Sequence, residues 1–389
     1  MAETTAGQRR AVVVGAGIGG LAAAIALRLV GWDAMVLEQA ERIEPVGAGI
    51  TLFVNAQAAL GVLGVLDAAR AVGTAPPMAN AGLREPSGRW LARVNQAAMP
   101  PLLVLHRADL HRVLLAALPE DCLRTGQRVE DVSDAAGGLL VSAGSAAGTA
   151  AHPADLVVGA DGLHSLVRSR LFPGQPGPRY SGYASWRGVT AGPVPLLGGG
   201  GETWGRGQRF GLVPMADGRV YWYATGNEAE GRAFADDHAE VRRRFAGWHP
   251  PIADVIAMTP AGAVLHHEIW WLPPLPRFTA GRVALLGDAA HAMTPDLGQG
   301  ACQALEDAVV LAARVGHADD VTAALASYDA QRRPRAQAVA RAARRIGRVG
   351  QAHGRMAVGL RTAAMRAAPA GGSLRMVRRL TSWTPPRLA

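Results

Sequence analysis

A glycine-rich turn between a short apolar run and an alanine-rich segment is the feature that most constrains how this chain can fold. Residues 11–14 have the composition of a strand buried on both faces of a parallel sheet, and Gly15 ends that strand. A helix is expected over residues 18–30, closed by Gly31, and a second strand is expected over residues 33–38. Strand, helix and strand in this order predict the opening of a doubly wound α/β fold.

The turn itself, "GAGIGG", predicts a site for a pyrophosphate. Gly15 allows the tight turn, Gly17 lets the backbone approach the phosphates, and Gly20 lets the helix pack closely on the strand. The N-terminus of the helix then offers free N–H groups and a favourable dipole. Glu38, at the end of the second strand, can accept hydrogen bonds from an adenosine ribose. The motif indicates an adenine dinucleotide and leaves open whether this is FAD or NAD.

A second segment, "GDAAHAMTPDLGQGACQALEDA" over residues 287–308, favours FAD. Glycine and proline cost free energy of folding in a segment that only connects two elements. A ligand is therefore expected to lie against this backbone. Asp288, which follows the apolar run 283–286, can bind the hydroxyls of an extended polyol. Gly298 and Gly300 present N–H groups at a helix start. A helix N-terminus stabilises negative charge, such as that of a reduced flavin, by up to about 1 kcal/mol and occasionally about 2.

The chain between these two segments differs in composition and in its pattern of expected strands. Residues 155–162 and 282–291 repeat the pattern of an apolar strand stopped by glycine and aspartate, and could belong to the sheet of the first strand. Between them, aromatic and β-branched segments with a hairpin signal at Asp217-Gly218 predict a mainly antiparallel sheet. We therefore expect a Rossmann-like FAD-binding domain from residues 1–75, 100–170 and 281–330, an inserted substrate domain from residues 76–99 and 171–280, and a C-terminal helical region over residues 331–389.

Four motifs occur in a fixed order: "GAGIGG" with Glu38, "LHRADL" at 105–110, "GADGLHSLVR" at 159–168 and "GDAAHAMTPDLGQG" at 287–300. As an ordered set they resemble the class A FAD-dependent monooxygenases of the aromatic hydroxylase type. The resemblance covers about residues 11–345, and the segment "TPDLGQGACQALEDA" is most similar to the urate hydroxylase and zeaxanthin epoxidase branch. It implies FAD as the cofactor, NADH or NADPH as a transient co-substrate, and molecular oxygen.

The resemblance assigns cofactor roles to charged residues spread over the chain. Glu38 would bind the adenosine ribose, and Arg42 would lie on the same half of FAD. Arg107 in "LHRADL" would contact FAD, the alternative being an exposed arginine near a helix start. Asp161 would serve both FAD and the nicotinamide, and Asp288 would hold the ribityl chain or the pyrophosphate.

Two loops would flank the flavin ring. Pro295 would lie beside the ring, and Leu297, Gly298 and Gly300 would contact its pyrimidine end. On the other edge, residues 47–49 resemble a family loop, although close strand packing is the alternative. The full set expected to bind the cofactor is Gly15, Gly17, Gly20, Glu38, Arg42, Gly49, Arg107, Asp161, Asp288, Pro295, Gly298 and Gly300.

In the chemistry that the family implies, the cofactor rather than protein side chains carries out the reactive steps. NADH or NADPH would reduce the flavin, and oxygen would then add at its C4a carbon. The resulting hydroperoxide would hydroxylate or epoxidise an aromatic, heteroaromatic or polyene-like small molecule, and exclusion of water would protect it. Two alternatives stay open: a flavin dehydrogenase or oxidase without oxygen insertion, and a non-catalytic flavin-fold protein that sequesters a reactive intermediate.

Three residues are candidates for catalysis: Asp296, Arg209 and Tyr223. An aspartate beside the flavin could orient or deprotonate an acidic N–H or O–H of the substrate, and the alternative for Asp296 is a helix N-cap. Arg209 and Tyr223, together with Trp186 and Trp222, are candidates for a roof over the flavin ring. Because side chains alternate along a strand, Trp222 and Tyr223 must point to opposite faces.

The formal net charge of +9 is a property of the C-terminal region. Residues 331–389 hold 14 of the 40 basic residues and no acidic one, which leaves 26 basic against 31 acidic residues elsewhere. We therefore expect no nucleic-acid partner. Two interpretations of the basic region are open: a solvated helix face, and a contact with a membrane surface or an acidic or carrier protein.

Cysteines and histidines indicate no further chemistry. Cys122 and Cys302 are too few and too far apart for a disulfide framework, and no signal peptide is evident, so a reducing cytoplasm is expected. His266, His267 and His291 lack the spacing typical of zinc or iron ligands, so no metal is expected. Either a monomer or a dimer is compatible with the sequence.

Overall fold

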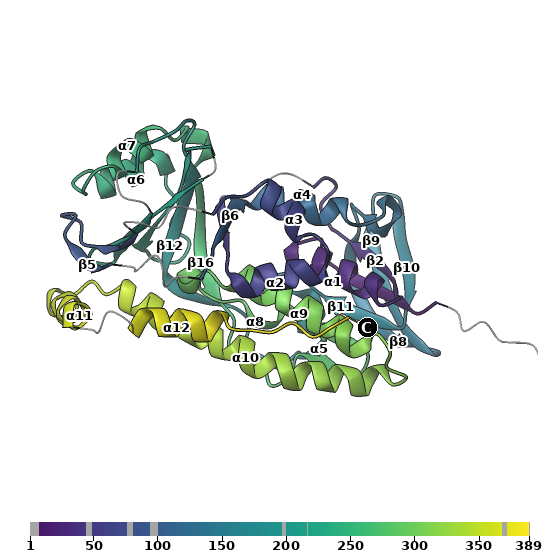
Figure 1. The fold of residues 1–389 in the computed structure, drawn as a ribbon. Helices are drawn as coiled ribbons and strands as arrows, with labels where there is room; N and C mark the ends of the chain where they lie inside the picture. The colour runs from purple at the N-terminus through teal and green to yellow at the C-terminus, as the bar shows by residue number, and fades with distance from the viewer. Residues whose placement is uncertain are drawn as a thin grey trace, which may run out of the picture.

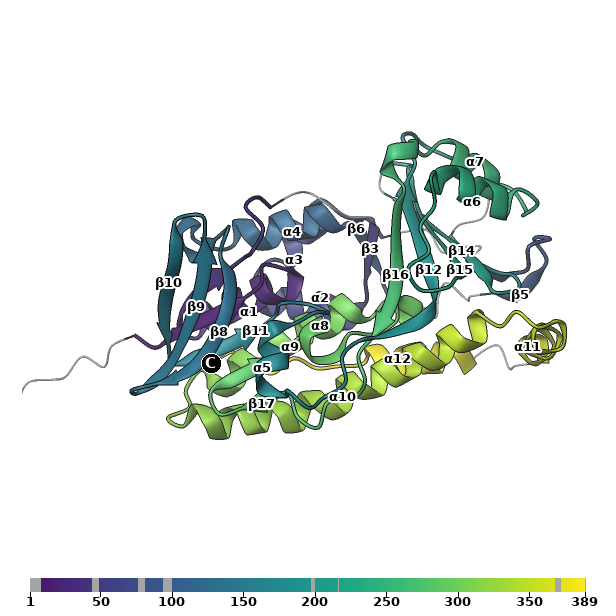
Figure 2. The same ribbon diagram turned by 180° about the vertical axis from the view of Figure 1, so that it is seen from behind.

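The computed structural model describes residues 8–43, 49–75, 81–93, 100–196, 200–215, 217–367 and 372–388. Two lobes built on β-sheets lie side by side (Figure 1). A long helix, α10 (Val321–Gly350), runs along one side of both lobes, as the reverse view also shows (Figure 2).

A six-stranded sheet forms the core of the first lobe, in the order β17-β18-β11-β1-β2-β7. All neighbouring pairs are parallel except β17 with β18. The predicted doubly wound core is confirmed, and the first strand, helix and second strand lie within one residue of the expected bounds. The elements are β1 (Arg10–Val14), α1 (Ile18–Leu29), β2 (Asp33–Leu37), β7 (Leu123–Arg124), β11 (Leu156–Gly159), β17 (Thr279–Ala280) and β18 (Val283–Leu285), with α9 (Gly300–Val315) packed on α1.

The first lobe contains further elements that the sequence did not predict. A three-stranded antiparallel sheet and a two-stranded one flank the core. Two of these strands, residues 138–145 and 148–154, are rich in small residues, so their intrinsic β-propensity is weak and cross-strand pairing stabilises them instead. The strands are β3 (Gly49–Leu52), β6 (Leu103–His106), β8 (Arg128–Ala135), β9 (Gly138–Ser145) and β10 (Gly148–Ala154). The helices and turns are α2 (Val54–Val62), α3 (Leu66–Ala71), α4 (Arg107–Ala116), η2 (Glu120–Cys122), α5 (Leu166–Leu171), α8 (Asp288–His291) and η4 (Pro295–Leu297).

The second lobe is a seven-stranded sheet in the order β16-β12-β15-β14-β13-β4-β5. Its pairing is antiparallel except between β13 and β4, which agrees with the mainly antiparallel sheet predicted for the middle of the chain. The division of the chain into domains at the expected boundaries stays a prediction. The strands are β4 (Gly82–Arg84), β5 (Trp90–Arg93), β12 (Arg179–Val189), β13 (Gly201–Trp204), β14 (Gln208–Pro214), β15 (Val220–Asn227) and β16 (Leu265–Trp271).

The two faces of the second sheet differ in chemistry. One face buries Trp186 and Trp222 in an apolar core with the helices of this lobe. The other face carries Arg209 and Tyr223, because side chains alternate along β14 and β15. The helices, which interrupt the region expected to be mostly strand, are α6 (Asp237–Phe245), α7 (Ile252–Ala257) and the short η3 (Ala261–Ala263).

Two shorter helices, α11 (Arg355–Ala367) and α12 (Gly372–Thr381), follow α10. The buried Arg361 of α11 donates hydrogen bonds to the carbonyl oxygens of Gly205, at 2.8 Å, and Gly350, at 3.0 Å. The helix therefore docks on the second lobe, while Met356 and Leu360 remain exposed. Within the described ranges, no helix combines the length and the apolar content needed to span a bilayer.

Candidate active site

Four adjacent parallel strands of the first lobe end at one edge of the sheet. Asp288 follows β18, Asp161 follows β11, Gly15 follows β1 and Glu38 follows β2. Because the four strands are neighbours in the order β18-β11-β1-β2, these residues lie in a row. Doubly wound sheets bind ligands at the carboxyl ends of their strands. The row could follow the length of an extended dinucleotide.

The glycines of the first turn show where a ligand could approach. A Cβ atom on Gly15 would lie 2.6 Å from the carbonyl oxygen of Ala160, and one on Gly20 would overlap the carbonyl oxygen of Gly15. The packing of the protein itself therefore requires both glycines, and Gly15 has a φ of +101°. By contrast, no described heavy atom beyond its chain neighbours lies within 4 Å of a Cβ built on Gly17. The open space at Gly17, before the N-terminus of α1, fits a pyrophosphate.

Glu38 is held by the backbone of the same turn. Its Oε2 accepts a hydrogen bond from the Ala16 N–H at 2.8 Å, and its Oε1 accepts one from the Ala40 N–H at 2.9 Å. The half-buried carboxylate is thereby fixed beside the open space where a ribose is expected. Asp161 has a structural task, because its Oδ2 accepts a hydrogen bond from the Val167 N–H at 3.1 Å near the start of α5.

Three charged residues of the predicted set are exposed: Arg42, Arg107 and Asp288. Across the ranges that the structure describes, none of the three side chains has a hydrogen bond or an ion pair. Their charged groups could therefore turn toward a ligand, and their roles stay predictions.

Gly49 begins β3, where a Cβ atom would overlap the ring of Tyr221. Close packing between the lobes therefore leaves no space for a side chain at this position, which agrees with the alternative interpretation. Its contact with FAD stays a prediction. Gly47 and Ala48 of the same loop lie outside the described residues.

The loop before α9 leaves backbone donors open. Pro295 begins η4, and Gly298 ends it in the left-handed conformation with a φ of +62°. No side chain caps the start of α9, and a Cβ on Gly300 would meet nothing within 4 Å among the described atoms. The amide nitrogen of the buried Gln299 also lacks a hydrogen-bond partner in the described part of the chain. These unused donors fit a flavin whose pyrimidine end accepts hydrogen bonds.

Asp296 lies on this loop and is held by two residues of the antiparallel sheet. Its side chain is fully buried and forms an ion pair with Arg209, whose side chain is 2% exposed. Tyr183 donates a hydrogen bond to Asp296 Oδ2 at 2.9 Å. Asp296 does not cap α9 or η4, so the N-cap interpretation is wrong. The fold thus brings Asp296 and Arg209 into direct contact, and the third predicted catalytic residue, Tyr223, lies in the same cluster beside Glu202.

A second carboxylate, that of Glu202, flanks Arg209 at 3.4 Å from its Nη1. Burial lowers the pKa of the Arg209 guanidinium, but Glu202 and Asp296 outweigh burial and raise it, so Arg209 is a permanent cation. Burial raises the pKa of the Tyr223 hydroxyl well above its usual value, and the neighbouring Glu202 raises it further. Burial and Asp296 act in the same way on the pKa of Tyr183. Both tyrosines are therefore neutral hydrogen-bond donors.

Two glycines of α10 make room for this cluster. A Cβ on Gly347 would overlap the carboxylate of Asp296. One turn further on, a Cβ on Gly350 would lie 2.9 Å from Arg209 Cδ. The sequence reasoning missed Tyr183, Glu202 and both glycines, because their roles depend on which strands and helices meet. The close approach of α10 therefore forms one wall of the site.

Two residues expected above the flavin lie elsewhere. Trp222 donates a hydrogen bond to Thr259 Oγ1 at 2.8 Å, and Trp186 stacks on His266 with ring centroids 4.8 Å apart. Both indoles belong to the apolar core on the far face of the second sheet. The prediction that they roof the flavin ring is wrong, whereas the prediction that Trp222 and Tyr223 point to opposite faces is confirmed.

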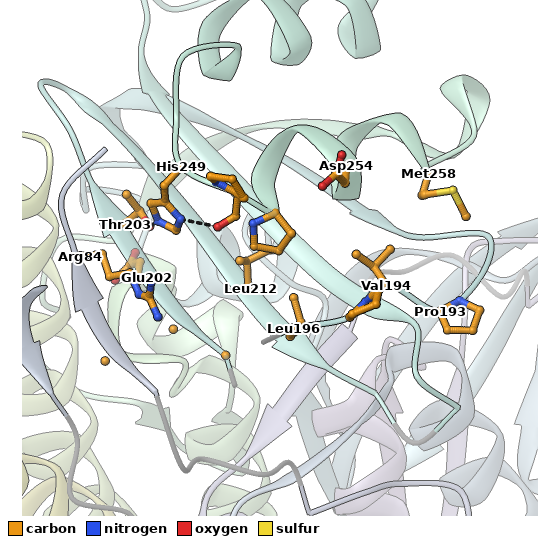
Figure 3. Close-up of a pocket in the computed structure, with 16 residues that line it drawn as sticks. Arg84, Pro193, Val194, Leu196, Glu202, Thr203, Leu212, His249, Asp254 and Met258 are labelled. Carbon is orange, nitrogen blue, oxygen red and sulfur yellow. Dashed lines mark hydrogen bonds between the residues drawn. The ribbon is translucent and has the colours of Figure 1, made fainter. Parts of the chain in front are cut away.

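The far face also holds a cavity of about 430 Å³ (Figure 3). Its lining includes Val194, Leu212 and Met258, and the hydroxyl of Thr203 lies 2.9 Å from His249 Nε2 at its edge. Leu212 pairs with Trp222 across β14 and β15, so the sheet separates this cavity from Tyr223. Glu202, which flanks Arg209, also lines this cavity, so the cavity meets the charged cluster around Asp296 at this one residue.

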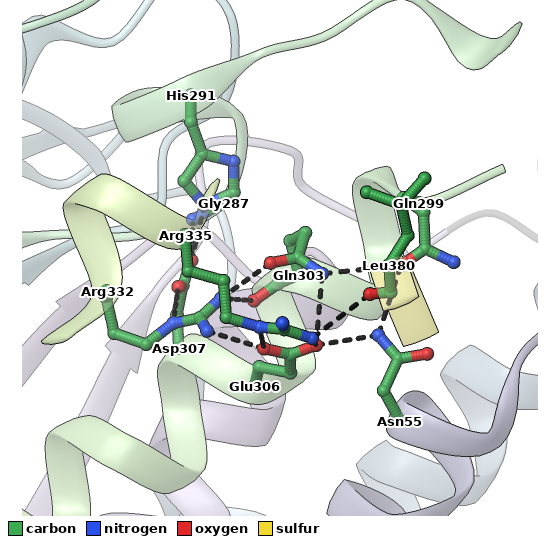
Figure 4. Close-up of polar contacts among 10 residues, drawn as sticks. All are labelled: Asn55, Gly287, His291, Gln299, Gln303, Glu306, Asp307, Arg332, Arg335 and Leu380. Atoms are coloured by element: carbon green, nitrogen blue, oxygen red, sulfur yellow. Dashed lines mark hydrogen bonds and ion pairs between the residues drawn. The ribbon is translucent and has the colours of Figure 1, made fainter. Parts of the chain in front are cut away.

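A buried ionic network lies next to residues 295–300, the loop expected to contact the flavin, and was not predicted from the sequence (Figure 4). We call these residues the flavin loop. Arg332 of α10 pairs with Asp307 at 2.7 Å and with Glu306 at 2.5 Å, and all three side chains are fully buried. His291 Nε2 lies 2.5 Å from Asp307, and Arg335 pairs with Glu306 at 2.6 Å. The sequence feature that could have indicated this network is the adjacent acidic pair Glu306 and Asp307 inside an otherwise apolar helix. The network fixes α9, and hence the loop before it, against α10.

The described histidines, cysteines and carboxylates form no cluster of three or more that could hold a metal ion. The thiol of Cys302 is buried beside the flavin loop, and burial raises its pKa to about 12. A thiol with so high a pKa is a poor nucleophile at neutral pH. Cys302 therefore fills space in α9.

Comparison with known proteins identifies the family. The sequence profile of the FAD binding domain family matches residues 8–343. The aurachin C monooxygenase/isomerase of Stigmatella aurantiaca is 40% identical over 91% of this chain and 93% of its own length. An FAD-dependent urate hydroxylase of Klebsiella pneumoniae is 37% identical over 83% of this chain and 85% of its own length. The 2-heptyl-3-hydroxy-4(1H)-quinolone synthase of Pseudomonas aeruginosa is 32% identical over 95% of this chain and 97% of its own length.

Solved structures agree with these matches. Klebsiella pneumoniae HpxO complexed with FAD and uric acid superimposes with a TM-score of 0.88 at 31% identity, covering 96% of this chain and 97% of that one. A salicylate hydroxylase substrate complex gives a TM-score of 0.77 at 25% identity, covering 98% and 99% of the two chains. The solved FAD-dependent hydroxylases thus share the fold of this chain.

Proposed function

Because the chain belongs to the FAD binding domain family and is a class A FAD-dependent monooxygenase, we propose that it hydroxylates an N-heteroaromatic small molecule with NADH or NADPH as electron donor. Two relatives are named for urate and for a 4(1H)-quinolone. Each of these rings has an N–H conjugated to a carbonyl group, and loss of that proton makes the ring more electron-rich. The observation that carries the proposal is the buried Asp296 on the flavin loop.

In this proposal Asp296 accepts the ring proton of the substrate. Oδ2 accepts a hydrogen bond from Tyr183, and Oδ1 is paired with Arg209, so the carboxylate is oriented from two sides. The ion pair with Arg209 and the hydrogen bond from Tyr183 fix the position of both carboxylate oxygens. Tyr183 uses its one O–H on Asp296 and Tyr223 lies beside Glu202, so both hydroxyls support the charged cluster. The proposed site thus places one base beside one cation, which suits a flat ring that bears N–H and C=O groups.

FAD, when bound, supplies electron transfer from the nicotinamide and activation of molecular oxygen. The chain's own residues hold the cofactor. We assign the pyrophosphate to Gly15, Gly17 and Gly20 at the start of α1, and the adenosine ribose to Glu38. The remaining assignments follow the family pattern: Arg42, Gly49, Arg107, Asp161, Asp288, Pro295, Gly298 and Gly300.

Substitution of Asp296 tests the proposed base. Asp296→Asn keeps the shape of the side chain and removes the proton acceptor, so we expect FAD to remain bound and coupled hydroxylation to fall by about 100-fold or more. The measurement is product formed per NADH or NADPH consumed, with hydrogen peroxide counted separately, over a panel of purines, quinolones and phenols. Asp217→Asn is the matched control, because Asp217 lies in an exposed hairpin turn and, among the described residues, pairs with Arg219 alone.

Two outcomes would argue against this assignment. Unchanged coupling in Asp296→Asn would remove Asp296 from the proton transfer. Strong stimulation of the wild-type enzyme by phenols, with no response to purines or quinolones, would replace the N-heteroaromatic substrate class by another aromatic one.

We also retain the proposed division into an FAD-binding domain, a substrate domain and a C-terminal helical region. A reducing compartment such as the cytoplasm suits the free, buried thiols of Cys122 and Cys302. We propose that the enzyme works as a monomer or a dimer, which light scattering on the FAD-loaded protein can decide.

A further inference from the structure

A second cavity, of about 280 Å³, lies behind Asp296. It opens where α10 passes the ends of β12 and β16, the arrangement visible in Figure 2. Tyr183 connects the two places, since it lines the cavity and its hydroxyl donates to Asp296. The catalytic proposal does not use this cavity.

Three arginines gather around this cavity. The guanidinium of Arg344 lies 3.6 Å from the ring centroid of Trp271, and that of Arg179 lies 6.0 Å from the same ring. Arg348 lines the cavity one turn along α10 from Arg344. Burial lowers the pKa of Arg344, and the charges of Arg348 and Arg179 lower it further.

None of these three arginines is paired with a carboxylate in the part of the chain that the structure describes. In the described ranges, Arg179, Arg344 and Arg348 take part in no ion pair. Gathering like charges costs free energy, which a bound anion would recover. Stacking on Trp271 also leaves the N–H groups at the edge of Arg344 free to donate.

Two buried oxygen atoms in the wall are unsatisfied. Ser181 Oγ and Gln351 Oε1 have no hydrogen-bond partner within the described residues. Gln351 is 8% exposed, and its amide nitrogen donates to Thr225 Oγ1 at 2.8 Å, so its free oxygen is fixed in place. Buried polar atoms are normally satisfied by protein, water or ligand. The wall therefore offers a hydroxyl that can donate to an anion and a carbonyl oxygen that can accept from a neighbouring hydroxyl.

We propose that this cavity binds the 2′-phosphate of NADPH. A phosphate monoester carries the charge and the oxygen geometry that guanidinium groups bind best, and the adjoining ribose supplies a hydroxyl for Gln351. NADH lacks this phosphate, so the cavity selects NADPH. The inference rests on the proposed use of a nicotinamide co-substrate.

The test compares NADPH with NADH in steady-state kinetics of the FAD-loaded enzyme. For Arg348→Gln we expect KM for NADPH to rise about tenfold, KM for NADH to change by less than about twofold, and kcat to stay unchanged. Arg348 is exposed and forms no hydrogen bond or ion pair within the described residues, so its replacement should not disturb folding. Arg344→Gln should act in the same direction. Arg345→Gln is the matched control, because Arg345 is an exposed neighbour on α10 that does not line the cavity.

Competition distinguishes the source of the phosphate. We expect 2′,5′-ADP to compete with NADPH in the wild-type enzyme and to lose most of this effect in Arg348→Gln. Equal changes for NADPH and NADH, no change in either, or competition by inorganic phosphate alone would overturn the proposal. So would a rise in KM for the aromatic substrate instead of NADPH. Failure of the proposed function is different, since the wild-type enzyme would then oxidise neither nicotinamide in response to any substrate.

Discussion

The three glycines of the first turn serve two different purposes. Gly15 and Gly20 are required because a Cβ at either position would collide with the protein's own backbone. Gly17 has no such conflict, so its lack of a side chain matters only when a ligand is present. Folding and cofactor binding can therefore be separated within a single motif.

Gly17→Ala should fold normally and bind FAD poorly. The apoprotein should keep its melting temperature within about 1–2 °C, because the new methyl group meets no protein atom. FAD affinity should fall by about tenfold or more, since the methyl group occupies the space expected for the pyrophosphate. Titration with FAD and thermal unfolding of the apoprotein measure the two effects. Gly20→Ala is the contrasting variant, and should lower the melting temperature of the apoprotein itself.

At the residue scale, sequence reasoning succeeded where a residue's task is local. Glu38 could be placed at the carboxyl end of a sheet strand, because the strand that precedes it is short and apolar. Tyr183 could not be found, because its partner Asp296 lies 113 residues away in sequence and the two meet only through the fold. Glu202 lies close to Arg209 in sequence, on the adjacent strands β13 and β14, but the sequence alone does not show that this hairpin packs against Asp296. The prediction that Trp186 lies above the flavin ring was wrong for a related reason. Side-chain alternation shows which residues share a face of the strand, but not which face meets the cofactor.

At the scale of elements, α10 is tied to α9 by the fully buried Arg332. Removing one member of a buried ion pair leaves an uncompensated charge, which typically costs about 3–5 kcal/mol. The helix holds Pro334 two residues further on, yet it continues without a break to Gly350. Packing of α10 against α9 thus outweighs the local preference of proline.

Arg332→Met should lower the free energy of unfolding by about 3–5 kcal/mol. Glu306 and Asp307 would lose their shared buried partner, although Arg335 would still pair with Glu306. Urea unfolding of the FAD-loaded protein measures the loss. Arg333→Met is the matched control, with an expected cost below about 1 kcal/mol, because Arg333 forms a partly exposed pair with Asp329. Similar losses in the two variants would contradict the role assigned to the buried network.

Elements with strong periodicity or sharp boundaries were predictable, and the small sheets were not. The glycine-bounded strand β1 and the helix α1 follow directly from apolar runs and breakers. The strand β9 contains glycine, serine and alanine, and β10 contains glycine, three alanines and a proline, so both have weak strand signals. Long-range pairing stabilises them, and one sequence gives no access to that pairing.

At the scale of the whole molecule, Asp307 joins segments that are distant in sequence. It contacts His291 of α8, Arg332 of α10 and the backbone of Gly287. Burial alone would raise the pKa of Asp307, but the charges of His291 and Arg332 outweigh burial and lower it to about 2, from an ordinary value of 3.8. The ionised carboxylate therefore stabilises the fold as a whole.

This lowered pKa predicts a loss of stability in acid. The contribution of Asp307, about 2 kcal/mol, should be complete above about pH 4 and should disappear as the pH falls toward 2. Urea midpoints at pH 5, 4 and 3 should fall with pH in the wild type. In Asp307→Asn the midpoint should be lower at pH 5 and should fall less steeply. Parallel curves for the two proteins would rule out Asp307 as a source of the acid sensitivity.

The glycines of α10 also determine how this enzyme can change during evolution or in the laboratory. Any side chain at Gly347 or Gly350 would push Asp296 or Arg209 aside, so both positions are closed to variation. The half-buried Val213 and Leu265 lie on the same sheet face as Tyr223 and carry no such restriction. A library aimed at new substrates should therefore randomise these two positions and keep α10 unchanged, so that ring size can be selected while the proton acceptor is preserved.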